Sequence, residues 1–290
     1  MNVIDLSQHN TITNWKLVKQ TVDGIILRVA YRGYGTGKIA IDNKFKTYAS
    51  ACKSEGIPFG IYFFSQAISE KEAIEEAEYC VKYANEVGVT IPYIYFDSEM
   101  SGTKDKSGRA DSLSKDLRTR CAVAFCNRIN QLGYKGGVYA SESWYSTNLD
   151  FAKIKDYSIW VANYGVNNGK QNKKPTTAKL DMWQYTSKAK PNYATGYIDH
   201  NIAYIDLTNK EINSKPQNKP VENTSTGKGI VKGDKVKIVD KALYYANTTG
   251  KVKIPQYVKQ RVHTVDKIDN DKVRLKEIWS WVMLSDLERV

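Results

Sequence analysis

Short apolar runs alternate with longer amphipathic segments through the first two thirds of the chain. Repeated strand–helix alternation of this kind is typical of a parallel sheet covered by helices. Eight runs have the length and composition of buried β-strands: Val3–Leu6, Gly24–Ala30, Phe59–Phe64, Ile91–Phe96, Gly137–Ala140, Ser158–Ala162, Leu180–Tyr185 and a last one near Tyr204–Leu207.

Three of the intervening segments carry an apolar stripe at helical spacing and predict amphipathic helices over Asp42–Glu55, Ser69–Glu86 and Ser114–Leu132. The second segment starts with Ser69 and Glu72 at the spacing of a capping box. Eight strands within about 205 residues fit a closed barrel. Because little helix separates the last three strands, we predict an irregular α/β barrel of the TIM-like (β/α) kind.

The pattern changes twice after this region. Residues 210–229 are polar, contain Pro216 and Pro220, and have the composition of a linker. Beyond them, polar and apolar residues alternate with a period of two, which is typical of strands. We therefore predict a barrel over residues 1–209, a linker over 210–229 and a small all-β, SH3-like domain over 230–290. The strands expected in the tail are Lys235–Asp240, Leu243–Tyr245, Gln260–Val265, Lys272–Leu275 and Trp279–Leu284. Turns are expected at Asn247–Gly250 and Asp269–Asp271.

Composition narrows the class of protein. With 41% hydrophobic and 26% charged residues, the chain has the composition of an ordered globular protein. We expect no membrane span, because no run of about 18 apolar residues occurs. We also expect no secretory signal, because the N-terminus lacks a basic segment followed by an apolar one, and so we place folding in a cytoplasm.

The net charge of +12 suits a polyanionic partner, either nucleic acid or an anionic surface such as a bacterial cell wall. The lysines are spread along the chain, and no basic helix, zinc finger or RNA-binding aromatic motif accompanies them. We therefore do not expect nucleic-acid binding. The cysteines and histidines follow no metal-ligand spacing, so we expect reduced, buried thiols and neither a metal nor a cofactor. These residues are Cys52, Cys80, Cys121, Cys126, His9, His200 and His263.

Two carboxylates, Asp97 and Glu99, follow the strand predicted over Ile91–Phe96. Residues two positions apart on a strand face the same side, and in parallel barrels the chemistry lies at the carboxyl ends of the strands. Two adjacent acids repel when both are ionised, so one retains its proton to higher pH. A proton donor beside an anion is the arrangement that cleaves glycosidic bonds. The alternative is a strand that ends in surface acids or caps the next helix.

Other predicted strands contribute acids and aromatic residues. If the barrel closes, Asp5 and Asp181 are expected to join Asp97 and Glu99 at one opening, although a lone Asp at a strand end is more often a cap. Arg28 either orients an acid or forms a structural ion pair. Aromatic rings stack on the apolar faces of sugars but also pack in ordinary cores. The aromatic residues on these strands are Tyr62, Phe64, Tyr139, Trp160, Tyr164, Trp183 and Tyr185.

Together these segments resemble glycoside hydrolase family 25, the lysozymes that cleave the β-1,4 bond between N-acetylmuramic acid and N-acetylglucosamine. The resemblance covers about residues 2–207 and rests on the stretches VIDLSQHN, GIILRVAYRGYGTGKIAIDNKF, GIPFGIYFFSQA, IPYIYFDSE, GGVYAS, IWVANY, LDMWQY and YIDHNIAY. It implies that Glu99 is the general acid, Asp97 is its partner carboxylate, and Asp5 and Asp181 are further acids at the barrel mouth. GIYFFSQ departs from the family's more frequent Gly-x-Tyr-His-Phe, so details of sugar positioning differ.

The mechanism stays open between two routes. In a retaining route the 2-acetamido group of the substrate attacks the anomeric carbon while Asp97 orients it. In an inverting route Asp97 or another acid activates water. Two acids close together on one strand favour the retaining route.

The tail resembles the wall-binding modules of clostridial phage endolysins through DKVKIVDKALYYANTTGKVKIPQYVK and VRLKEIWSWVMLSDL. This implies peptidoglycan and an anionic wall polymer as partners, bound through Tyr244, Tyr245, Trp279 and Trp281, some of which must also form the core. The sequence leaves self-association through the tail open. The resemblance also implies accumulation in the host bacterial cytoplasm and release to the wall through a separate membrane-permeabilising protein. Two other functions remain as alternatives: an inactive wall-binding protein, and a glycosidase acting on another N-acetylated polymer such as chitin.

Overall fold

The computed structural model describes residues 1–88, 91–102, 105, 107–208, 230–240, 242–246 and 252–290. The chain separates into two compact units, Met1–Pro216 and Gln217–Val290. The predicted linker over 210–229 and the predicted turn at Asn247–Gly250 lie outside the described residues. Within the described part, none of the helices combines the length and apolar character needed to cross a bilayer.

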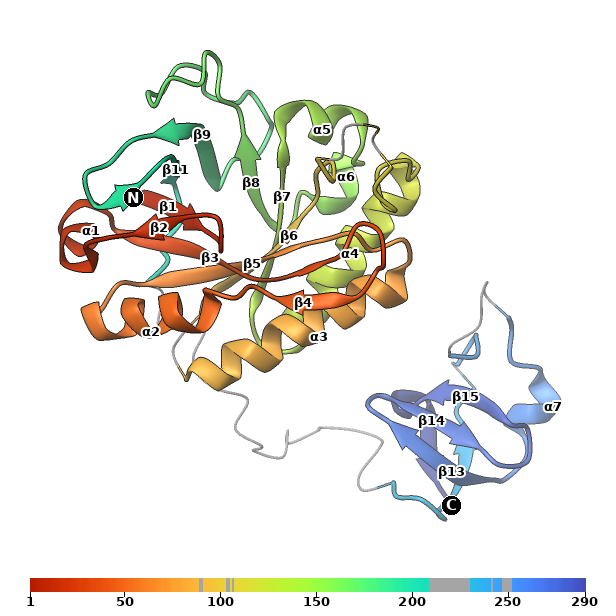
Figure 1. Cartoon of the computed structure of the whole chain (residues 1–290). Helices are drawn as coiled ribbons and strands as arrows, with labels where there is room; N and C mark the ends of the chain where they lie inside the picture. Colours follow the sequence, from red (N-terminus) through yellow and green to blue (C-terminus); the bar gives the residue numbers. More distant parts are fainter. Residues whose placement is uncertain (89–90, 103–104, 106, 209–229, 241, 247–251) are drawn as a thin grey trace. The chain divides into compact units, whose positions relative to one another are not determined.

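The first unit is a barrel of eight strands, which follow one another in the order β1-β11-β9-β8-β7-β6-β5-β3 before β3 pairs back with β1 (Figure 1). The strands are β1 (Asn2–Leu6), β3 (Gly24–Arg32), β5 (Phe59–Phe64), β6 (Tyr93–Asp97), β7 (Lys135–Ser141), β8 (Ser158–Ala162), β9 (Met182–Ala189) and β11 (Ile198–Ala203). The predicted closed α/β barrel is thus confirmed. A further strand, β4 (Ile39–Ile41), forms an antiparallel hairpin with β3.

One predicted strand is wrong. The eighth strand was expected near Tyr204–Leu207, but it lies at β11 and runs antiparallel to both of its neighbours, β9 and β1. Its sequence, IDHNIA, carries polar residues that point into the barrel, so it lacks the apolar run that marks the other strands. The irregularity of the barrel is therefore located at β11.

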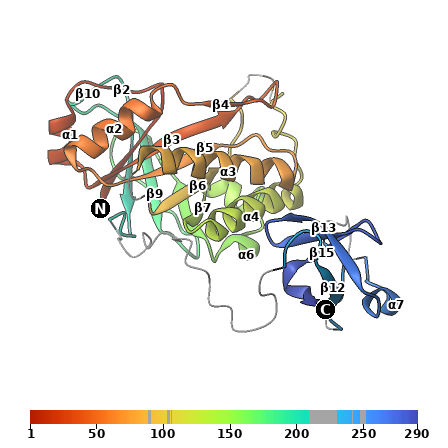
Figure 2. The same cartoon turned by 90° about the horizontal axis from the view of Figure 1, so that it is seen from below.

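Helices cover the outer face of the parallel strands (Figures 1 and 2). α2 packs on β3, α3 on β5, and α4 on β6 and β7, while α3 and α4 contact each other. Ser69 and Ser114 cap α3 and α4 through their hydroxyl groups, as expected of N-cap residues. The helices of this unit are α1 (Trp15–Thr21), α2 (Phe45–Glu55), α3 (Glu70–Val87), α4 (Lys115–Gln131), α5 (Glu142–Thr147) and α6 (Phe151–Ile154), and two short strands, β2 (Thr11–Ile12) and β10 (Ala194–Thr195), pair with each other.

Strand alternation divides the core into two layers. Residues such as Ile94 and Phe96 face the helices, while Tyr95 and Trp160 fill the barrel interior. Gly137 is required opposite Tyr95, because a Cβ there would lie 2.4 Å from the tyrosine ring. The four cysteines are free and buried, as predicted. This packing fixes the inward-facing residues at the carboxyl ends of the strands.

The second unit contains a five-stranded antiparallel sheet in the order β15-β14-β13-β12-β16. Its elements are β12 (Lys235–Ile238), α7 (Gln256–Lys259), β13 (His263–Asp269), β14 (Lys272–Leu275), β15 (Ser280–Met283), the 3-10 turn η2 (Leu284–Asp286) and β16 (Leu287–Arg289). The segment Leu243–Tyr245, predicted as a strand, contributes a single bridge from Tyr244 to Lys253. The second unit therefore contains a small antiparallel sheet and the short helix α7, and the all-β, SH3-like domain stays a prediction.

Candidate active site

Asp97 and Glu99 lie where β6 ends. Asp97 is the last residue of the strand and pairs with Phe64 on β5 and Tyr139 on β7. It lies on the same face as Tyr95 and therefore points into the barrel, where it is 3% exposed. Its Oδ1 atom has no hydrogen-bond partner among the described residues. Burial and the charge of Glu99 raise the pKa of Asp97 well above its usual value, so the two acids compete for a proton.

Glu99 is exposed on the open side of the site. The protein packed around its other sides, followed by the charge of Asp5, raises the pKa of Glu99 to about 7, although Arg28 opposes the rise. A carboxylic acid that keeps its proton near neutral pH is suited to donate that proton to a leaving group.

Asp5 is the third acid and is held by two amides. Its Oδ2 atom accepts hydrogen bonds from Gln184 Nε2 at 2.8 Å and Asn201 Nδ2 at 2.9 Å. Burial raises the pKa of Asp5 to about 6 despite these donors. Asp5 is paired in register with Asp199 on β11. The predicted position of Asp5 at the barrel mouth is consistent with this geometry.

Asp199 is the fourth acid of this cluster and is not among the acids that the sequence predicts for the site. Burial, together with the charges of Asp5 and Glu99 and a side-chain hydrogen bond with Asp5, raises the pKa of Asp199 to about 9. Asp199 is therefore protonated at neutral pH. It belongs to the stretch YIDHNIAY, but the strand there was expected six residues further along, so Asp199 was not placed at a strand end.

Asp181 does not join the other acids, contrary to expectation. It immediately precedes β9, and β9 runs parallel to β8, so Asp181 lies at the amino ends of the strands. Its carboxylate accepts the backbone N–H of Ile159 at 2.8 Å and lies 3.4 Å from Lys179 Nζ. It lines a separate cavity of about 340 Å³ with Tyr93 at the start of β6. The acid cluster lies at the end of the barrel where the parallel strands have their carboxyl ends, and Asp181 lies at the opposite end, which removes it from the site.

Arg28 supplies positive charge to the acid cluster. Its Nε lies 2.8 Å from Asp42 Oδ2, and the two side chains are 11% and 1% exposed. Arg28 opposes the rise in the pKa of both Asp97 and Glu99. Arg28 therefore forms the structural ion pair offered by the sequence and lowers the pKa of the acids through its charge, while its role in orienting an acid stays a prediction.

The aromatic residues predicted for sugar binding separate into three groups. Tyr139 and Tyr164 donate hydrogen bonds to Gln184 Oε1 at 2.7 and 2.6 Å and so join the chain of contacts that ends at Asp5. Tyr62 and Phe64 are half-buried on β5, on its inward face. These four residues lie on the same face of the sheet as the acids or at its edge.

The remaining aromatic residues do not reach the acid cluster. Trp160 is 1% exposed and donates from Nε1 to Asn201 at 2.8 Å, so it supports the site from within the core. Trp183 and Tyr185 alternate with Gln184 on β9 and so face outward, where Tyr185 contacts His200. The prediction that these three residues contact the sugar is therefore corrected.

A groove of about 510 Å³ opens beside Glu99. Its walls come from the ends of β7 and β8 and from the loop that follows β8. The lining residues are Glu99, Tyr139, Ser141, Glu142, Ser143, Ala162, Asn163, Tyr164, Gly165 and Lys173. An extended groove of hydroxyl groups, amides and tyrosines next to a protonated acid is suited to a polar polymer such as a glycan.

Two aromatic residues described in the second unit, Trp279 and Tyr257, are well exposed, and Trp279 also has an unusual backbone conformation. Trp279 is 65% exposed and has a positive φ of 48°. Arg274 stacks on Trp279 at 4.2 Å and lies 5.7 Å from Trp281, and its guanidinium also pairs with Asp266 at 2.6 Å. A bulky residue in a left-handed conformation is uncommon, and such strain occurs most often at functional positions. Tyr244 and Tyr245 are partly exposed near this sheet and both make contacts.

Comparison with known proteins gives a consistent picture of the first unit. The family model described as Glycosyl hydrolases family 25 matches residues 4–192. The lysozyme of Streptococcus phage Cp-1 is 26% identical over 213 residues, which are 70% of this chain and 53% of that protein. The lysozyme of Streptococcus phage Cp-7 is 27% identical over 190 residues, covering 63% and 49%. The chain thus spans about half the length of the curated relatives it matches.

Solved structures show the same fold. The catalytic domain of the endolysin ply40 from bacteriophage P40 of Listeria monocytogenes is 29% identical with a TM-score of 0.59, covering 74% of this chain and 98% of that chain. The autolysin LytC of Streptococcus pneumoniae, solved with a synthetic peptidoglycan ligand, is 27% identical with a TM-score of 0.59, covering 70% and 46%. The spore cortex lytic enzyme SleM of Clostridium perfringens, at 17% identity and a TM-score of 0.59, covers 100% and 96% and shows similarity of fold alone.

Proposed function

The chain belongs to the glycosyl hydrolases of family 25, and on this premise we propose that it hydrolyses the β-1,4 bond between N-acetylmuramic acid and N-acetylglucosamine in peptidoglycan. The observation that carries the proposal is the cluster of Asp5, Asp97, Glu99 and Asp199, beside a groove, at the end of the barrel where the parallel strands have their carboxyl ends. Four acids in one place repel one another when ionised and are therefore costly to fold. The cluster therefore weighs against an inactive wall-binding protein.

Each acid has a role that follows from its environment. Glu99, protonated below about pH 7, donates its proton to the glycosidic oxygen as the bond breaks. Asp97 has a free, inward-facing oxygen that accepts the N–H of the substrate's 2-acetamido group. Asp5 and Asp199 share a proton beside them and keep the site negative enough to stabilise the developing oxocarbenium ion.

We favour the retaining, substrate-assisted route. The acetamido oxygen attacks the anomeric carbon, which produces a cyclic oxazolinium intermediate. Water then attacks that carbon and returns a proton to Glu99. NMR of the first products tests the route, because retention yields the β-anomer initially, whereas an initial α-anomer requires the inverting route.

Product analysis tests the proposed activity. The full chain is incubated with purified peptidoglycan, and new reducing ends are identified by mass spectrometry after borohydride reduction. Reduced muramic acid is the expected product. Reduced glucosamine would instead indicate cleavage of the other glycosidic bond of peptidoglycan, and cleavage of chitin at a comparable rate would support a glycosidase for another N-acetylated polymer.

For the second unit we propose attachment to an anionic polymer of the cell wall. The exposed Trp279, with Arg274 stacked on it, offers an apolar face for a sugar ring beside a cation. The roles of Trp281, Tyr244 and Tyr245 in the same surface, self-association through this unit, and release through a separate membrane-permeabilising protein stay predictions.

A further inference from the structure

Helix α3 carries a buried acid that the proposed reaction does not use. Glu76 is 0% exposed and lies on a stripe of small apolar residues with Ala73, Ala77 and Cys80. Burial raises the pKa of Glu76 to about 7 even though Arg32 lies beside it. The stripe around Glu76 is apolar, so the buried carboxylate serves its polar partners, one of which is the buried Arg32.

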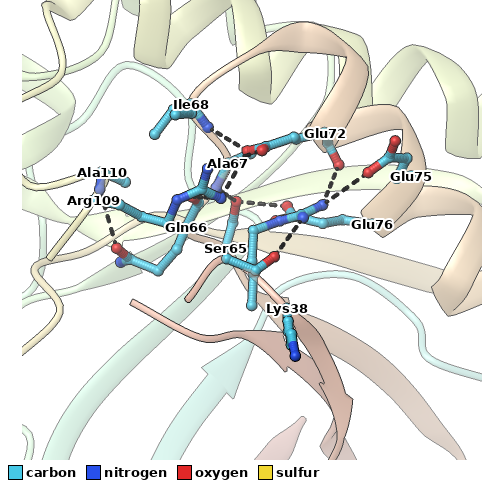
Figure 3. Close-up of polar contacts among 12 residues, drawn as sticks. Lys38, Ser65, Gln66, Ala67, Ile68, Glu72, Glu75, Glu76, Arg109 and Ala110 are labelled. Atoms are coloured by element: carbon cyan, nitrogen blue, oxygen red, sulfur yellow. Dashed lines mark hydrogen bonds and ion pairs between the residues drawn. The ribbon is translucent and has the colours of Figure 1, made fainter. Parts of the chain in front are cut away.

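The contacts of Glu76 lead towards the active site. Its Oε1 accepts from Arg32 Nε at 2.7 Å, and its Oε2 accepts from the Ser65 hydroxyl at 2.6 Å (Figure 3). Ser65 directly follows β5, and its backbone N–H donates to the carbonyl of Asp97 at 3.0 Å. A continuous chain of short hydrogen bonds thus joins α3 to the backbone of Asp97.

A second set of contacts holds the segment that follows β5, which begins with Ser65, and connects it to residues that follow Glu99 in the chain. Arg109 binds both oxygens of Glu72 at 2.9 Å, and Glu72 also accepts the N–H of Ile68 at 2.9 Å (Figure 3). Gln66 accepts the N–H of Ala110 at 3.2 Å. The segment after β5 is therefore fixed on both sides.

We propose that Glu76 is a positioning residue for the reaction: acting through Ser65, it sets the backbone of Asp97 and hence the direction of the free carboxyl oxygen that meets the substrate. This inference rests on the proposed function. Among the residues that the structure describes, none forms a hydrogen bond with Asp97 Oδ1, so the direction of this oxygen depends on the backbone and on packing. Displacement of a reacting group by about 1 Å is enough to lower a rate by up to 10²-fold.

The test uses Glu76→Gln in the full chain. Glutamine has one acceptor oxygen where glutamate has two, so it cannot accept from both Arg32 and Ser65. We expect kcat to fall about tenfold with KM within about twofold. We also expect the pH–rate profile to shift, because a displaced Asp97 interacts differently with the neighbouring Glu99. Glu78→Gln is the control, since it removes an Arg–Glu pair of 2.8 Å from the exposed side of the same helix, and it is expected to leave kcat unchanged.

Ser65→Ala breaks the same link from its other side and leaves the Arg32–Glu76 pair intact, while also removing the hydroxyl that accepts the N–H of Ala67 at 3.2 Å. We expect Ser65→Ala to lower kcat as Glu76→Gln does, and the double variant to lose no more than the more severe single variant. If Glu76→Gln does not fold, the kcat and pH profile of Ser65→Ala test the positioning role by themselves. Two results would overturn the inference. One is that both single variants keep the wild-type kcat and pH profile when measured well below their melting temperatures. The other is that the losses of the two single variants multiply in the double variant. Failure of the wild type to cleave peptidoglycan would instead refute the proposed function.

Discussion

Removal of Arg28 tests whether the acid cluster is electrostatically costly. Arg28 Nε lies 2.8 Å from Asp42, and both side chains are largely buried. Asp42 also accepts the backbone N–H groups of Gln8 at 2.8 Å and Lys44 at 3.0 Å. Arg28→Gln keeps a polar side chain of intermediate length but removes the charge that opposes the high pKa values of the acids.

The expected loss follows from this burial. Removing one partner of a buried ion pair costs about 3–5 kcal/mol. Because Asp42 keeps two backbone donors, we expect a value near the lower end, about 3 kcal/mol. For a domain of this size, each kcal/mol lowers the melting temperature by roughly 2–4 °C, so the barrel transition should fall by about 6–12 °C.

The loss should also depend on pH. Acids whose folded-state pKa is raised stabilise the fold below their unfolded pKa, near 4, and this contribution is lost as the pH rises through the folded pKa. The folded pKa values of Asp5 and Glu99 are about 6 and about 7, and removing Arg28 raises that of Glu99 further. The difference in melting temperature between wild type and Arg28→Gln is therefore expected to be larger at pH 8 than at pH 5.

Scanning calorimetry of the full chain at both pH values measures these shifts. Arg120→Gln is the matched control, because Arg120 is 49% exposed and pairs with Glu70 and Asp116 on the surface. Such pairs contribute about 1 kcal/mol or less. Equal shifts for the two variants, or a difference for Arg28→Gln that does not widen at pH 8, would refute the electrostatic reasoning.

Three further outcomes are expected. Asp199→Ala should lower kcat tenfold or more in a reducing-sugar assay, whereas Asp181→Ala should change kcat less than twofold. The reason is that Asp199 contacts the acid cluster and Asp181 does not. Equal losses in the two variants would contradict this placement. The value of kcat/KM should fall as the pH rises through about 7, where Glu99 loses its proton; a rate still rising at pH 9 would exclude Glu99 as the acid. Trp279→Ala should weaken co-sedimentation of the full chain with cell walls at least tenfold. Tyr257→Ala, at a similarly exposed residue, should not weaken it. Unchanged binding by Trp279→Ala would show that Trp279 is not part of the wall-binding surface.

Much of the barrel was accessible from sequence because its strands are apolar and its helices amphipathic. The strands of the parallel part of the barrel begin or end within a few residues of the predicted runs. These strands are β1, β3, β5, β6, β7, β8 and β9. The Asp-x-Glu spacing after β6 likewise placed Asp97 and Glu99 together, since both the strand and its direction were clear.

β11 was not accessible in the same way. Its inward positions are occupied by Asp199 and Asn201, which serve the site, so the strand lacks an apolar pattern and was predicted too late in the chain. Asp181 was misplaced for a related reason: it is adjacent to a strand, but only strand direction tells which end of the barrel it occupies. The role of Glu76 depends on contacts between α3 and the end of β5, which no local pattern reveals.

The most direct test of the central claim is Glu99→Gln. The substitution keeps the size of the side chain and removes the transferable proton, which should lower the rate of reducing-sugar release from peptidoglycan by about 10²–10⁴-fold. Co-sedimentation of the variant with walls should equal that of the wild type. Release of reducing sugar by Glu99→Gln at the wild-type rate would contradict the assignment of Glu99 as the general acid, and with it the account of this site.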